Sequence, residues 1–426
     1  MSDTINEDTT TGSSVLEGKS ASESAVEVPA AAAVPKKTFG DMLRGDLGFI
    51  PVLLTLIVIA LYFQLTTGGL VDGIFLSPRN LSYLVLQIAN IAMLSLGVTL
   101  VLLLGEIDLS LASVATLSAV VMGVLSTRAG FPGWAAILAG ILTGTVAGLI
   151  NGFFIGILRI PSFIVTLAAS IAYAGLLLNL LNGQATLILN DPLLINIAGS
   201  PRSYLPDIYG IMLPIIGLLG YIASLLYNQA QRRRKGLKLT PTGTLIAQIV
   251  VPTILVIGAV ILFESYQGVP YSTAIIFGFI LIFWLILTRT TFGRHIYAVG
   301  GNAEASRRAG INVTFIRIAV FTLCSTLAAI GGILAASRGN AVASQISSTL
   351  LLDAIAAAVI GGISLFGGKG AIWSIVLGVL IIGSLENGLA LKSQGSDVQQ
   401  MVEGAVLIIA VTVDAVIRRL QLRTGR

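Results

Sequence analysis

The chain has 426 residues, of which 55% are hydrophobic and only 11% are charged, with a mean hydropathy of +0.94. Soluble proteins carry about a quarter of their residues as charges, so this composition excludes an ordinary soluble protein and predicts one that lies mostly in a bilayer. One histidine (His295) and one cysteine (Cys324) are too few for a metal cage or a disulfide framework. The net charge of +5 would suggest nucleic-acid binding in a soluble chain, but in a membrane protein it indicates topology, and we expect no nucleic-acid partner.

Residues 1–47 form a tail that is rich in Ser, Thr, Glu and Ala and has no sustained hydrophobic period. Such a segment cannot bury enough apolar surface to offset its chain entropy, so we expect it to be disordered. Its eight acidic and four basic residues precede the first apolar run, which is the wrong charge for a signal peptide. The first hydrophobic segment is therefore expected to remain as a membrane span.

Residues 48–426 consist mainly of apolar runs, and a helix needs about 20 such residues to cross a bilayer. We expect an all-α, polytopic membrane protein with about 10 to 12 transmembrane helices. The candidate spans are 48–65, 84–104, 109–126, 134–156, 162–181, 209–228, 244–263, 270–288, 314–336, 351–366, 371–390 and 399–417. Polar or glycine residues interrupt the apolar run between the two spans on either side of GEIDLS, and likewise around FGGKG. Re-entrant segments near 105–110 and 362–370 are therefore the alternative to complete spans.

The basic residues test the orientation, because Lys and Arg in short loops stay on the cytoplasmic side. A twelve-span topology with the N-terminal tail inside places 20 of the 25 basic residues in cytoplasmic segments. We therefore expect both termini to be cytoplasmic.

Small residues recur at every fourth position of the span over 134–156. They are Gly140, Gly144, Gly148, Gly152 and Gly156. A stripe of this kind lets another helix approach closely. It predicts tight packing within one subunit, and a subunit interface is the alternative.

Carboxylates inside the spans are the first candidates for function, because each costs roughly 2.5 to 3.5 kcal/mol at a helix centre unless it is compensated. In the segment GEIDLS, Glu106 and Asp108 interrupt an apolar run. Asp108 or Ser110 is placed to cap the helix that follows. The alternative is a broken helix that lines a polar cavity, where irregular backbone is tolerated at membrane depth.

Two later segments also carry polar residues within apolar surroundings. Asp353 begins DAIAAAVIGG and either caps a helix or lines a cavity. Glu386 and Asn387 lie late in a span with no basic residue nearby in sequence, so we expect them to contact something polar along a path. Glu403, in the first turn of the last span, is interpreted as structural.

Residues 288–317 form the largest well-patterned polar loop on the predicted inner side. Asn302 is placed to cap a short helix with Glu304 in its first turn. Arg307 and Arg308 follow in its last turn, and Gly310 fits the left-handed position after its end. A capped helix at the cytoplasmic surface is typical of a docking element, while a simple connection between spans is the alternative. Gly300 and Gly301 are expected to let the loop turn sharply before it.

No phosphate-binding loop is present to supply energy. The nearest match, GGISLFGGKGA, lacks the first glycine at the required offset, and Gly370 stands where a Ser or Thr would hold Mg²⁺. We therefore expect no ATPase activity and no cofactor in this chain. If ATP drives transport, a partner chain must bind ATP and Mg²⁺.

Five segments together resemble the permease subunits of bacterial monosaccharide ATP-binding-cassette (ABC) importers, in the order that family shows. They are LGVTLVLLLGEIDLSLASV, GLINGFFIGILRIPSFIVTLAASIAYAGLL, TFGRHIYAVGGNAEASRRAGINV, LLDAIAAAVIGGISLFGGKGAIW and ENGLALKSQGSDVQQMVEGAVLIIAVTVDAVIRR. The chain is most similar to the xylose type, which also carries an extra hydrophobic pair (about 209–263) around a basic loop, here NQAQRRRKGLKLTP. Glu106 departs from the glycine of many members but is similar to the xylose type. The acidic tail has no counterpart in the family.

The resemblance implies a homodimer in the bacterial cytoplasmic membrane, two cytoplasmic ATPase subunits and an extracytoplasmic sugar-binding protein. The polar loop would then contact the ATPase subunits and move with them during ATP hydrolysis. Its residues are Gly301, Asn302, Glu304, Arg307, Arg308 and Gly310. Asp108 and Asp353 would lie near the dimer axis and the translocation path. We accordingly expect sugar transport by alternating access, with the monosaccharide left open among xylose, arabinose, galactose, fructose and glucose.

Two other classes of protein remain as alternatives. A proton-coupled secondary sugar transporter also suits about twelve spans and buried acids, but it explains a capped docking loop poorly and would need strong intramembrane bases. A membrane-embedded enzyme would have to work with a single histidine and no metal motif.

Overall fold

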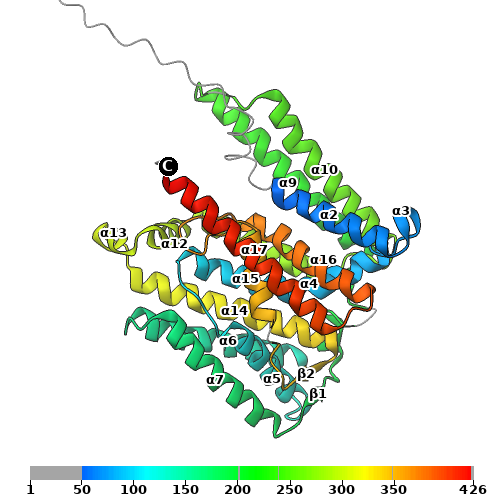
Figure 1. Ribbon diagram of the computed structural model, residues 1–426, viewed down its shortest axis with the longest axis vertical. Helices are drawn as coiled ribbons and strands as arrows, with labels where there is room; N and C mark the ends of the chain where they lie inside the picture. The colour runs from blue at the N-terminus through cyan, green and yellow to red at the C-terminus, as the bar shows by residue number, and fades with distance from the viewer. Residues whose placement is uncertain (1–49, 200–201, 238, 348, 424–426) are drawn as a thin grey trace, which may run out of the picture. The chain divides into compact units, whose positions relative to one another are not determined.

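Long apolar helices make up most of the structure, as the composition predicts (Figure 1). The computed structural model describes residues 50–199, 202–237, 239–347 and 349–423, so the predicted tail over 1–47 lies outside the described residues. The elements are α2 (Ile50–Thr66), α3 (Gly69–Asp72), α4 (Pro78–Leu103), α5 (Leu111–Thr127), α6 (Gly133–Gly156), α7 (Ser162–Leu181), β1 (Thr186–Ile188), α8 (Pro192–Asn196), α9 (Asp207–Arg234), α10 (Thr242–Glu264), α11 (Tyr271–Arg289), α12 (Thr291–Gly301), α13 (Ala303–Arg308), α14 (Val313–Gly339), β2 (Ala341–Ala343), α15 (Leu350–Ile360), a 3₁₀ turn (Ile372–Ser374), α16 (Ile375–Leu391) and α17 (Ser396–Arg423).

The predicted spans coincide with helices. Among the described residues, eight helices are long and apolar enough to cross a membrane, namely α4, α6, α7, α9, α10, α11, α14 and the 3₁₀ turn continued by α16. The shorter apolar helices α2, α5 and α15 and the 28-residue α17 cover the remaining predicted spans. The protein is therefore a polytopic membrane protein that is almost entirely helical, and the cytoplasmic placement of its termini stays a prediction.

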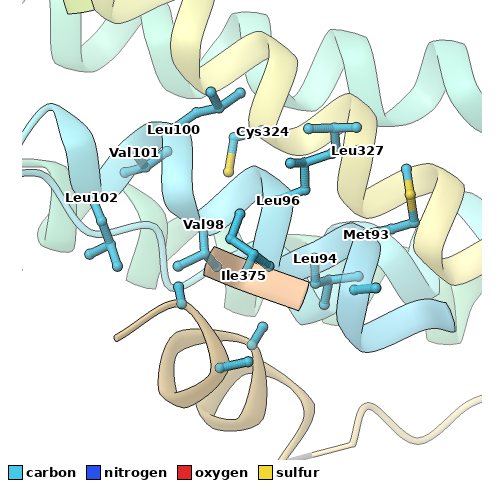
Figure 2. Packing of buried hydrophobic residues seen from close by; sticks show 14 of the residues in the cluster. Met93, Leu94, Leu96, Val98, Leu100, Val101, Leu102, Cys324, Leu327 and Ile375 are labelled. Carbon is cyan, nitrogen blue, oxygen red and sulfur yellow. The ribbon is translucent and has the colours of Figure 1, made fainter. Parts of the chain in front are cut away.

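Helix α4 lies at the centre of the packing. Every residue over 91–103 is buried, which is typical of a helix segment surrounded on all sides, and α4 packs against α14, α15, α16 and α11. Figure 2 shows Met93, Leu96 and Leu100 of α4 beside Cys324 and Leu327 of α14, and all five are at most 1% exposed. At its start, the Ser77 hydroxyl accepts a hydrogen bond from the N–H of the third helical residue, so the helix begins with a formed cap.

The glycine stripe of α6 faces α14 of the same chain along the full length of the helix. A methyl group added at Gly148 would lie 2.6 Å from the Phe321 carbonyl oxygen and 2.7 Å from the Thr322 Cα atom. At Gly140, Gly144, Gly152 and Gly156 an added methyl group would likewise meet α14 or α5 within 3 Å. The stripe therefore lets the two backbones come close, which is the packing arrangement that small residues at this spacing favour.

Helices α9 and α10 form a peripheral hairpin, the extra hydrophobic pair of the sequence. None of the described residues of α10 is buried, and the pair contacts the rest of the protein mainly through α4. Its many exposed Leu and Ile side chains suit a surface that faces lipid. The basic connection is closed by two hydrogen bonds, each 3.2 Å, between the side-chain amide of Gln229 and the backbone of Thr240.

Three features differ from the sequence-based expectation. The helix predicted over 351–366 ends at Ile360, because Gly361 and Gly362 follow and Gly362 adopts a φ of 89°. At 11 residues it reaches only about 16 Å, roughly half of a bilayer core. A two-stranded antiparallel sheet of β1 and β2 was not expected, and neither was α12 within the polar loop.

Candidate functional site

The GEIDLS segment breaks the helical chain between α4 and α5 and holds a buried carboxylate. Asp108 is 4% exposed, and its Oδ1 atom accepts hydrogen bonds from the backbone N–H and the hydroxyl of Ser110 at 2.9 and 2.6 Å. The other oxygen, Oδ2, has no hydrogen-bond partner among the described residues. The expected cap is not formed, because neither Asp108 nor Ser110 accepts a hydrogen bond from an N–H of the first turn of α5. The segment is thus a helix break without the expected cap, and a role in lining a polar path stays a prediction.

A chain of hydrogen bonds runs from Asp108 to the neighbouring helices. Asn151 of α6 donates from Nδ2 to the Ser110 hydroxyl at 2.9 Å, and the Tyr173 hydroxyl of α7 donates to Asn151 Oδ1 at 3.3 Å. Thr166 of α7 accepts a bond from the backbone N–H of residue 109 at 3.0 Å. Sequence reasoning missed these three partners, although Asn151 was visible as a lone amide within an apolar span.

Glu106, the neighbouring acid, pairs with Arg317 of α14 rather than with Asp108. The distance from Glu106 Oε1 to the Arg317 guanidinium is 2.9 Å, and the two side chains are only 17% and 25% exposed. A cavity of about 10 Å³, enough for roughly one water molecule, is lined by Glu106, Asp108 and Ile355 of α15 among others. The GEIDLS segment thus joins α14 and α15 at one point.

The predicted docking helix is present as α13 and has the expected caps. Asn302 Oδ1 accepts the N–H of Ala305 at 2.9 Å, and Gly310 adopts a φ of 84° after the helix end. Glu304 pairs with Arg307 at 3.3 Å and with Arg308 at 3.4 Å. These three charged side chains are 47 to 79% exposed, so α13 offers a free polar surface on the described part of the protein.

The preceding helix α12 ties the docking helix to the membrane helices. Gly300 does not form the turn that was expected but lies in the last turn of α12, where its backbone touches the Leu103 carbonyl at the end of α4. The same carbonyl accepts the N–H of Gly368 at 2.9 Å. The Tyr297 hydroxyl donates to the Gly370 carbonyl at 2.9 Å, and burial raises the pKa of Tyr297, so the phenol stays a donor. Gly301 follows at the exposed end of the helix.

Three acids of the C-terminal helices interact electrostatically with one another. Asp353 of α15 is 6% exposed, and the negative charges of Glu386 in α16 and Glu403 in α17 act on it. Among the described residues, no group of three or more His, Cys, Asp or Glu side chains is placed to hold a metal ion. Electrostatic neighbours of this kind inside a membrane protein typically face a polar path.

Asn387 is buried and makes contacts within the helix bundle. Its Oδ1 accepts a bond from the Asn80 amide at 2.8 Å, and its Nδ2 donates to Gln87 Oε1 at 3.3 Å. These bonds join α16 to α4 and engage both the oxygen and the nitrogen of the Asn387 side-chain amide. A role of Asn387 along a path therefore stays a prediction, and Glu386, which is half-buried, is the freer of the two residues.

Comparison with known proteins places these elements in a family. Residues 80–411 match the family described as the permease component of the branched-chain amino acid transport system. The xylose transport system permease proteins XylH of Haemophilus influenzae and Escherichia coli are 33% and 34% identical to the chain, over 85% and 89% of it and 95% of each relative. The ribose import permease protein RbsC of Bacillus subtilis is 32% identical over 84% of the chain and 91% of the relative.

No solved structure matches the chain. The family match covers α4 to α16 and much of α17, and so includes the GEIDLS break, the docking loop and the acids of the C-terminal helices. The curated relatives are about a third identical over nearly their whole lengths. The expected resemblance to xylose-type permeases is thus confirmed, and the protein belongs to the family of membrane permeases that serve as subunits of ABC sugar importers.

Proposed function

We propose that the chain is the membrane subunit of an ATP-driven monosaccharide importer and that its substrate is a pentose such as xylose. The observation that carries this proposal is the exposed, capped helix α13, whose neighbour α12 packs against the end of α4 and donates a hydrogen bond to the FGGKG turn. The similarity to XylH proteins, which are named for xylose transport, supports the choice of sugar. Two copies of the chain would enclose the path in the bacterial cytoplasmic membrane, with both termini on the cytoplasmic side.

In this proposal the chain has partners that bind at its two faces. Two cytoplasmic ATPase subunits, which bind ATP and Mg²⁺, would dock on α13, and an extracytoplasmic binding protein would deliver the sugar. The match to a permease family supports the assignment of ATP hydrolysis to a partner, because a permease subunit is not itself the ATPase.

The mechanism that the geometry favours is alternating access. A displacement of α13 would be passed to α12 and to the first turns of α14, because the loop between α13 and α14 is only four residues long. From there, two contacts reach the membrane core: the Glu106–Arg317 ion pair and the hydrogen bond from Tyr297 of α12 to the FGGKG turn. Packed interfaces of this kind switch between discrete arrangements rather than deforming smoothly, so a small motion at α13 can tilt whole helices.

A complementation experiment tests the proposal. The chain is expressed in cells that lack pentose uptake, together with its ATPase and binding protein or with either one omitted. We expect uptake of labelled xylose only when all three are present, because the chain supplies the path and not the energy. Equal uptake by cells that express the chain alone would contradict the proposal.

A further inference from the structure

A cavity lies between α4 and α14, at the opposite end of α14 from the docking helix. Its volume is about 270 Å³, and it is lined by Leu86, Asn90, Leu334, Ala335, Arg338 and Gly339. Drug-sized ligands occupy about 300 to 1,000 Å³, so this cavity suits a smaller molecule, of about a dozen heavy atoms. Arg338 and Gly339 are exposed, so the cavity opens where α14 ends.

Two polar side chains in this cavity have free hydrogen-bonding groups. Within the described ranges, no hydrogen bond or ion pair engages the guanidinium of Arg338, which carries five N–H donors. Asn90 Oδ1 accepts the N–H of the next residue at 2.8 Å, while no bond from its Nδ2 atom is formed within the same ranges. Polar groups without partners in an otherwise apolar cavity are the usual means by which a ligand is oriented.

The surrounding charges indicate what kind of ligand fits. The negative charge of Glu386 acts on Arg338, and Glu386 in turn interacts electrostatically with Asp353 and Glu403. This negative charge beside Arg338 disfavours an anion, which the guanidinium alone would attract. A neutral molecule with several hydroxyl groups meets no such repulsion. It can accept hydrogen bonds from Arg338 and Asn90 and place its C–H face against the leucine and alanine side chains that line the cavity.

The position of the cavity agrees with a role in transport. Helix α14 has 27 residues and is thus about 40 Å long. The docking helix precedes its first residue, and the cavity lies at its last turn. A sugar bound there would lie on the side of the membrane opposite the ATPase, where an importer receives its substrate.

We propose that the cavity between α4 and α14 is a binding site for a neutral monosaccharide, with Arg338 and Asn90 as the groups that orient the sugar. This inference rests on the proposed function and adds to it the place where the sugar first binds to the chain. The sequence alone did not predict a role for either residue. Arg338 was expected to be a charge in an outer loop, and Asn90 is a polar residue within an apolar run.

Alkylation of an introduced cysteine measures occupancy of the cavity directly. The single native cysteine, Cys324, is 0% exposed and is not expected to react. An Ala335→Cys variant is purified in nanodiscs with its ATPase subunits and labelled with a maleimide in the presence of xylose, ribose, arabinose or fructose. Ala343→Cys, at an exposed position of β2 beyond the same end of α14, is the matched control. Sucrose serves as a sugar that is too large for the cavity.

We expect at least one of the four monosaccharides to slow the labelling of Ala335→Cys about tenfold at about ten times its Kd, since only the unoccupied fraction reacts. Labelling of Ala343→Cys, and labelling in sucrose, should not change. In the Ala335→Cys background, Arg338→Gln and Asn90→Leu should each raise the sugar concentration needed for half-protection by at least about tenfold, because each removes hydrogen-bond donors to the sugar. Arg79→Gln, in the first turn of α4 and outside the cavity, should leave it unchanged.

The outcomes separate this inference from the proposed function. If none of the four sugars protects Ala335→Cys while the wild-type complex imports one of them, the cavity is not a sugar site and the inference is wrong. Protection that persists unchanged in both Arg338→Gln and Asn90→Leu would also overturn it. If the wild-type complex with its partners imports no monosaccharide, the proposed function itself fails, whatever the labelling shows.

Discussion

Single residues decide how the GEIDLS segment is held between the membrane helices. Asp108 is fixed by Ser110 and, through it, by Asn151, while Glu106 reaches Arg317 on α14. The sequence indicated a helix break and two acids at this place but not their partners. Arg317 and Asn151 are distant in sequence from both acids, and only the packing of α6 and α14 against the break brings them together. Continuous motifs are visible in the sequence, so the resemblance to a family could be predicted from them. Arg338 and Asn90 meet only through the packing of α14 against α4, so their shared cavity could be found only in the structure.

The Glu106–Arg317 ion pair should be needed for coupling, and charge reversal tests it. In Glu106→Arg or Arg317→Glu, two like charges would meet at a site that is less than a third exposed, which we expect to cost about 1 to 3 kcal/mol of stability. We expect either single change to lower xylose uptake about tenfold or more while ATP hydrolysis continues. The double variant, which restores the pair with reversed polarity, should recover most of the uptake.

The measurement is the ratio of sugar imported to ATP hydrolysed, together with the melting temperature of each purified complex. A double variant that is as defective as the single ones would show that the pair does not act through its mutual attraction. A single variant with the wild-type ratio would remove the pair from the coupling route.

At the level of elements, the apolar runs predicted helices well because a bilayer leaves few other structures possible for them. What the sequence did not reveal depends on contacts between elements. Helix α12 is amphipathic and buries Ile296 and Val299 against the bundle, and the β1–β2 pair joins segments more than 150 residues apart. Helix α15 ends before the glycines at 361 and 362. The sequence did not predict this end, because glycines occur both in turns and at helix interfaces.

The glycine stripe of α6 should be required for stability because α14 leaves no room for side chains there. Gly148→Ala places a methyl group within 2.7 Å of two backbone atoms of α14, which we expect to cost about 1 to 3 kcal/mol. Gly175→Ala in α7 is the matched control, since no atom lies within 4 Å of the added methyl group. Its gain in helix propensity, about 1 kcal/mol, should leave the protein as stable as wild type or more so. Thermal unfolding of both variants in detergent compares them, and an equal melting temperature would contradict the close approach of α6 and α14.

The docking helix α13 should bind the ATPase through its exposed charges. We expect Glu304→Lys, which places three like charges on one short helix, to abolish co-purification of the ATPase, and Arg307→Glu to do the same. Arg234→Glu, at the end of α9, is a control for a charge reversal in another basic segment and should leave binding intact. The measurement is the amount of ATPase that is retained on the tagged permease. Retention equal to wild type in both α13 variants would contradict docking at this helix.

For the whole molecule, the structure separates two ends of one long helix. At the start of α14 lie α13, α12, the Glu106–Arg317 pair and the FGGKG turn. At its end lies the cavity with Asn90 and Arg338. In the proposed importer, α13 would contact the ATPase on one face, the cavity would receive sugar toward the other, and α14 would connect them.

Transport by the purified complex tests the central claim most directly. The permease, its ATPase and its binding protein are reconstituted in proteoliposomes, and the initial rate of labelled xylose transport is measured with ATP or with an imposed proton gradient as the energy source. We predict ATP-dependent uptake that is unchanged when the proton gradient is collapsed, and no uptake when the ATPase is omitted. Accumulation of xylose by the permease alone under a proton gradient would contradict the account and would identify the chain as a secondary transporter.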